Sequence, residues 1–114
     1  MVDKIIENAL STLGVPVQRV MFKSPQKPPA FIIWQYITSQ PSNYADDDNE
    51  TTDHTLRVHI YAKQNYTTLL ESTVAALKKA GCTIASIDSE IYEEETGFFH
   101  RPITIYFLEE QQCN

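Results

Sequence analysis

Three histidines and a run of acidic residues are the side chains of this 114-residue chain whose types could support chemistry. His54, His59 and His100 could each ligate a metal ion or act as a general base. His54 and His59 have opposite parity along one expected strand, so they point to opposite faces and cannot share a site there. We expect exposed or edge-strand histidines, and we predict neither a metal site nor a catalytic residue.

The run from Asp46 to Glu50 (DDDNE) is rich in the oxygen ligands that calcium prefers. It lacks the alternating ligand spacing and the central glycine of an EF-hand loop, so a solvated flexible loop is the preferred interpretation. The three glycines, Gly14, Gly81 and Gly97, each fit a turn or a helix cap. No glycine-rich phosphate loop is present, and we predict no cofactor.

The two cysteines, Cys82 and Cys113, are too few for a disulfide framework and lack metal-ligand spacing. Cys82 is predicted to be a small buried side chain. No serine stands in the sequence context of a nucleophile elbow. The residues that could do chemistry therefore do not assemble into a recognisable catalytic motif.

Composition excludes further classes. The formal net charge of −6 disfavours a general nucleic-acid binder, which needs clustered Lys and Arg. No run of eighteen apolar residues predicts a membrane span. The N-terminal stretch has acidic residues within its apolar part and no cleavage signature, so we expect no signal peptide and a chain made in the cytoplasm.

A strand followed directly by a helix, residues 55–81, is the stretch on which the expected fold is built. Leu56, Val58, Ile60 and Ala62 alternate with polar side chains, which is typical of a strand with one buried face. Apolar residues three and four apart then predict a helix to about residue 80. Its N-terminus has two candidate caps, a capping box of Thr68 with Glu71 or a cap by Asn65. Gly81 is expected to end it.

The remaining elements are predicted from the same patterns. We expect a helix over residues 3–13 and strands over 15–22, 30–38, 82–92 and 98–108. Pro102 favours an edge position or a bulge for the last strand. Between the strands lie a basic, proline-rich connector (23–29), a long acidic loop (about 39–53) and a turn (93–97), and a flexible tail occupies about 109–114.

The element order is therefore helix, strand, strand, strand, helix, strand, strand. It predicts one α+β domain spanning residues 1–114, with two helices packed on a mixed or antiparallel sheet of about four to five strands. Trp34 and Tyr36 would place large aromatic side chains on one sheet face. Such residues are enriched at protein interfaces, although the N-terminal helix could equally cover that face.

The layout resembles the small tail-completion or tail-terminator proteins (head-tail joining proteins) of long-tailed bacteriophages and prophages. The resemblance spans nearly the whole chain and lies in the first helix ending LGVPV, then PPAFIIWQYITSQPSNYADDD, HTLRVHIYAKQNYTTLLESTVAALKKAG and EEETGFFHRPITIYF. It implies a non-enzymatic virion protein, assembled in the bacterial cytoplasm, that forms a hexameric ring at the head-tail interface. Its partners would be other copies of itself, the tail tube protein and a head-connector protein.

Under this resemblance, DNA would pass through the ring without specific binding, and the acidic balance would suit such a channel. The acidic loop and the 93–97 turn would contact the tube or a neighbouring subunit. The candidate interaction residues are Tyr44, Asp46, Asp47, Asp48, Glu50, Glu93, Glu94 and Glu95.

Three other functions remain open from the sequence. The chain could be another phage neck or head-completion protein, which would bind on the portal side. It could be a small ligand-binding regulatory domain with a pocket between helix and sheet. It could also be an enzyme that uses His54 or His100 with a carboxylate, which single substitution of each histidine would test.

Overall fold

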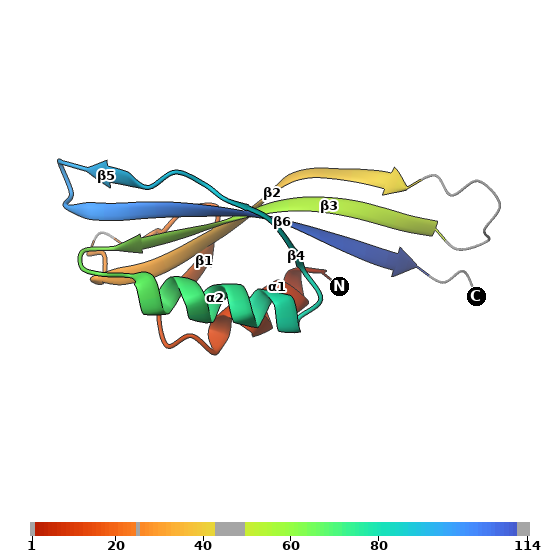
Figure 1. Ribbon diagram of the computed structural model, residues 1–114, viewed down its shortest axis with the longest axis horizontal. Helices are drawn as coiled ribbons and strands as arrows, with labels where there is room; N and C mark the ends of the chain where they lie inside the picture. The colour runs from red at the N-terminus through yellow and green to blue at the C-terminus, as the bar shows by residue number, and fades with distance from the viewer. Residues whose placement is uncertain (1, 25, 43–49, 112–114) are drawn as a thin grey trace.

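The computed structural model describes residues 2–24, 26–42 and 50–111. These residues form an α+β fold with two helices packed on one mixed sheet, as predicted (Figure 1). The sheet has six strands rather than four or five, because the stretch expected as one strand over 82–92 is divided in two. The elements are α1 (Val2–Ser11), β1 (Val17–Arg19), β2 (Ala30–Ser42), β3 (Glu50–Ala62), α2 (Thr67–Lys79), β4 (Thr83–Ile87), β5 (Ile91–Glu93) and β6 (Phe98–Gln111).

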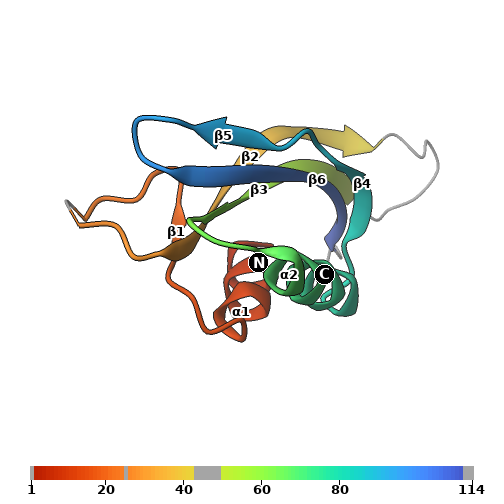
Figure 2. The same cartoon turned by 60° about the vertical axis from the view of Figure 1, so that its left-hand side comes forward.

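The sheet has the strand order β1-β2-β3-β6-β4, and β5 also pairs with β6. Only β1 and β2 run parallel; the other pairs are antiparallel. Both helices lie against the same face (Figures 1 and 2). Among the described residues, no helix covers the other face, which we call the open face.

The main core lies between the helices and the sheet. Ile6 and Leu10 of α1 and Leu77 of α2 are fully buried against Trp34 and the apolar side chains of β3 and β6. Burying one such side chain contributes about 1.5–3 kcal/mol. The N-terminal helix therefore covers the sheet face that carries Trp34, and this face is not left exposed for a partner.

Helix α2 begins without the capping box. Its cap residue, Tyr66, makes no side-chain capping hydrogen bond, whereas the Thr67 N–H donates to Asn65 Oδ1 at 3.0 Å. The helix ends as expected at Gly81, whose N–H donates to the Lys78 carbonyl and whose φ of +100° suits glycine. Cys82 follows at once and is buried as predicted; burial raises the pKa of its thiol to about 11.

Three strands continue past the helices as an extension that we call the arm, made of residues 38–42, 50–55 and 106–111 (Figure 1). The prediction of a loop over 39–53 was wrong at both ends, since Ser39 pairs with His54 and Ser42 with Thr51. The predicted tail was also too long, because β6 reaches Gln111. Residues 39–42, 50–53 and 109–111 are mostly polar, because no helix covers this part of the sheet. They therefore lack the period-two pattern of a strand with one buried face.

Pro102 lies in an interior strand, not at an edge as its residue type favoured. Its carbonyl accepts the Asp88 N–H at 2.8 Å on the side of β6 where β4 has ended and β5 has not begun. The N–H and C=O of a strand residue point to the same side, so the missing proline N–H faces this break in the ladder. A proline is therefore accommodated in the middle of the sheet.

Candidate assembly surfaces

Two of the three histidines form a pair on the open face. His59 Nδ1 lies 2.7 Å from His100 Nε2, and the Tyr61 ring stacks on His100 with centroids 4.3 Å apart. The expectation of exposed or edge-strand histidines was wrong here, because β3 and β6 are interior strands and both rings are half-buried. As predicted, His54 and His59 lie on opposite faces, since β3 alternates regularly between them.

The electrostatics of this pair disfavour protonation. Burial, then the neighbouring His100 and the positive charge of Arg57, lower the pKa of His59 to about 4. Burial also lowers the pKa of His100, which Glu93 partly opposes. A hydrogen bond between two rings needs one acceptor nitrogen, so His59 and His100 cannot both become positively charged without breaking that bond. The pair supports the packing of the open face rather than supplying a solvated base.

His54 joins the three strands of the arm. One ring nitrogen lies 2.7 Å from Ser39 Oγ of β2, and the other lies 3.0 Å from Glu109 Oε1 of β6. A serine, histidine and carboxylate in series have the order of a hydrolytic triad. Ser39, however, lies in a paired strand and not on the strained turn that presents a nucleophile. We therefore interpret the three side chains as a cross-strand tie.

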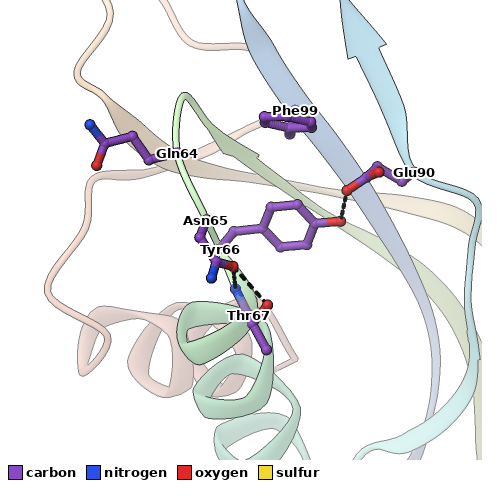
Figure 3. A pocket seen from close by; sticks show the side chains of 6 residues that line it. All are labelled: Gln64, Asn65, Tyr66, Thr67, Glu90 and Phe99. Atoms are coloured by element: carbon purple, nitrogen blue, oxygen red, sulfur yellow. Dashed lines mark hydrogen bonds between the residues drawn. The ribbon is translucent and has the colours of Figure 1, made fainter.

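A small pocket of about 310 Å³ lies where α2 begins, between the β3–α2 connection and β6 (Figure 3). The Tyr66 hydroxyl donates to the Glu90 carboxylate across it, which ties the start of α2 to the segment between β4 and β5. Burial and this hydrogen bond raise the pKa of Tyr66. The carboxylate of Glu90 therefore lies in the pocket and accepts the hydrogen bond of the Tyr66 hydroxyl. The lining residues are Gln64, Asn65, Tyr66, Thr67, Glu90 and Phe99.

Within the described residues, no group of three or more His, Cys, Asp or Glu side chains is placed to hold a metal ion. Neither helix of that part of the chain is long and apolar enough to cross a membrane.

The predicted interaction residues divide into two groups. Tyr44, Asp46, Asp47 and Asp48 lie outside the described residues, and Glu50 is the first residue of β3 and not part of a loop. The others occupy the sharp connection from β5 to β6, where Glu94 and Glu95 are exposed. Glu93 is half-buried, and its carbonyl accepts the Gly97 N–H at 2.8 Å to close the turn. The structure thus joins these glutamates to one edge of the sheet.

The two edges of the sheet carry opposite charges. The segment 17–29, which contains β1, has three basic residues and no acidic one. The segment 83–97, which contains β4 and β5, has five acidic residues and no basic one. Because β1 and β4 are the outermost strands on either side, the basic and acidic segments lie at opposite edges (Figure 2).

Exposed apolar side chains accompany these edges, and sequence reasoning missed most of them. Val20 and Met21 follow β1, while Ile87, Ile91 and Tyr92 lie along β4 and β5. Tyr106 and Leu108 are exposed on the open face of the arm. The sequence predicted which side chains of each strand alternate between its two faces. It did not predict the order of the strands in the sheet, which decides which strands are outermost.

The described residues form an α+β domain whose candidate sites are its two oppositely charged sheet edges and the arm. No protein-family model and no curated protein matches the chain. Among solved structures, the chain is similar to a chain in the virion of a native gene transfer agent particle. The two are 11% identical, the match covers 93% of this chain and 92% of that one, and the TM-score is 0.60. This likeness shows a shared fold over nearly the full length.

A second match is to a crystal structure from Akkermansia muciniphila. It is 13% identical and covers 96% of this chain but 49% of the other, with a TM-score of 0.44. That likeness is too weak to bear on the fold.

Proposed function

We propose that this chain is a structural subunit of a phage-like virion, forming a ring that caps the tail tube and joins tail to head. The observation that carries the proposal is the arm, which projects beyond the helix-covered body (Figure 1). In the sequence, two of its strands are joined by the acidic segment 43–49. A full-length likeness of fold to a chain from a gene transfer agent virion supports it. The proposal assigns no reaction and no cofactor.

The arm suits contact with neighbouring proteins for a physical reason. Beyond Trp34, where β1 ends its pairing, and beyond Tyr106, where β4 ends its pairing, the outer sides of β2 and β6 have no strand partner among the described residues. Unpaired strand edges and exposed apolar side chains such as Tyr106 and Leu108 are surfaces that the tail tube can cover. In a ring of six such subunits, the net charge of −6 on each chain would suit a channel through which DNA passes without adhering.

Electron microscopy of tail tubes tests the proposal. Purified wild-type protein added to tubes is expected to bind one end and halt their elongation. In intact virions, antibody labelling is expected to find the protein at the head-tail junction. Binding to the head side alone would instead indicate a neck or head-completion protein. Absence from virions, with no effect on tubes, would contradict both.

We propose that the acidic segment 43–49, which joins two strands of the arm in the sequence, contacts the tube through Tyr44, Asp46, Asp47 and Asp48, together with Glu50 of β3. The variant Asp46→Lys/Asp47→Lys/Asp48→Lys is expected to fold normally and to lose tube capping, because the sign of the contact surface is reversed. Glu7→Lys, at an exposed position of α1, is the control for a charge reversal elsewhere on the surface. Normal capping by the triple variant would remove this segment from the contact surface.

A further inference from the structure

A strained turn presents two apolar side chains at the basic edge of the sheet. The Val20 N–H donates to the Trp34 carbonyl at 2.9 Å, and the Met21 N–H then donates to the Arg19 carbonyl at 2.8 Å. This closes a γ-turn on Val20, whose φ is +71°. A β-branched residue at positive φ is an outlier that persists only where something favours it. The turn leaves Val20 59% and Met21 57% exposed.

The acidic edge of the sheet carries a surface that these side chains would fit. A groove of about 340 Å³ runs between α2 and β4, lined by the apolar side chains of Leu70, Val74, Ala75 and Ile87, with Glu71 and Lys78 beside them. Farther along the same edge, Ile91 and Tyr92 of β5 are each about half exposed. The edge therefore combines a hollow with exposed apolar area.

The two edges also differ in the sign of their charge, as two complementary binding surfaces would. Lys23 and Lys27, just after the Val20–Met21 turn, are exposed, and neither forms an ion pair within the described residues. Glu94 and Glu95, in the turn after β5 and farther along this edge than the groove, are likewise exposed, and neither forms an ion pair within the described residues. Complementary charge at the rim of an apolar contact steers association and fixes its register.

We infer that the partner of each edge is a second copy of this chain: the Val20–Met21 turn of one subunit docks in the Leu70–Val74–Ile87 groove of the next. The inference rests on the proposed function and adds the interface to it. Because the two surfaces differ and lie at opposite edges, the contact is head-to-tail, and repetition closes a ring when the rotation allows. A symmetric dimer would instead bring like edges together.

Two variants that each lack one half of the contact provide the test. Val20→Gly/Met21→Ser removes the apolar turn while placing glycine where φ is positive, and Ile87→Lys blocks the groove with a basic side chain. Each variant alone is expected to associate about tenfold or more weakly than wild type in light scattering across a concentration series. An equimolar mixture is expected to form a 1:1 dimer and nothing larger, since only one turn and one groove remain intact.

Leu108→Ser is the matched control, because Leu108 is a similarly exposed apolar residue on the arm. It is expected to associate like wild type, and circular dichroism should show that all variants are folded. The inference is overturned if wild type stays monomeric at every concentration, if either variant associates like wild type, or if the mixture stays monomeric. None of these results bears on tube capping by wild type, so the proposed function is judged separately.

Discussion

The burial of His59 and His100, and for His59 also the neighbouring His100, make the stability of the folded chain depend on pH. Both pKa values are lower in the folded chain than the ordinary value of 6.5, and that of His59 is about 4. At pH values between about 4 and 6.5, the histidines of the unfolded chain bind more protons than those of the folded chain. The contribution to stability is therefore complete above pH 6.5 and is lost as the pH falls toward 4.

We expect the free energy of unfolding to decrease from about pH 7 to about pH 4.5, by at most about 1.4 kcal/mol per pH unit for each histidine. Denaturant unfolding at several pH values measures this slope. The double variant His59→Asn/His100→Asn should show a flatter dependence over the same window. Equal slopes for the variant and wild type would show that other groups, and not this pair, set the pH dependence.

Val20 provides a second residue-scale prediction, which concerns stability alone. Side chains at positive φ cost roughly 1–2 kcal/mol relative to glycine, and Val20 is too exposed for its packing to compensate fully. Val20→Gly is therefore expected to leave the free energy of unfolding of the monomer unchanged or to raise it by up to about 1 kcal/mol. Calorimetry at low protein concentration measures this. A loss of more than about 1 kcal/mol would mean that the turn is held by packing within the subunit.

Among the elements, the arm depends most on polar contacts, because no helix covers it. His54 connects Ser39 of β2 and Glu109 of β6, and its side chain is only 11% exposed. His54→Ala removes both hydrogen bonds, and because water can reach Ser39 and Glu109, it is expected to cost about 0.5–1.5 kcal/mol. Hydrogen exchange should show the loss of protection concentrated in residues 38–42, 50–55 and 106–111. Loss spread evenly over the sheet would contradict a local role.

The arm also shows where sequence reasoning reached its limit within an element. Residues 56–62 were predictable as strand because burial under the helices imposes apolar alternation. Residues 30–34 were predictable because their β-branched and aromatic side chains make both strand faces apolar. Residues 39–42 and 50–53 were not, since a strand exposed on both faces has no such pattern and resembles a loop in composition. Cross-strand backbone hydrogen bonds, to which side-chain type contributes little, decide the structure there.

At the scale of the molecule, the chain is elongated, with extents of 52 × 24 × 23 Å and a radius of gyration of 15.6 Å. A compact chain of this length would have a radius of gyration of roughly 13 Å. The arm accounts for the difference, because it adds length without adding a second layer. The oppositely charged edges lie on the two sides of the long strands, which is the placement that head-to-tail assembly needs.

A charge exchange tests this whole-molecule polarity. Lys23→Glu/Lys27→Glu and, separately, Glu94→Lys/Glu95→Lys are each expected to weaken self-association by about threefold to tenfold at low salt, since like charges would then face each other. Mixing the two double variants should restore a complementary contact, and high salt should reduce every difference. Sedimentation velocity over a salt series measures these effects. Unchanged association of either double variant would exclude charge as a factor.

The sequence by itself determined the α+β class, the two helices, the buried alternation of the central strands and the glycine that ends α2. These features are local, because burial periodicity and cap chemistry are expressed within a few turns or residue pairs. Only the tertiary structure decided that β6 is an interior strand, that His59 meets His100, and that a basic edge with an apolar turn lies opposite an acidic edge with a groove. Each of these depends on strand order, which is set by packing between segments distant in sequence and leaves no periodic pattern in any one of them.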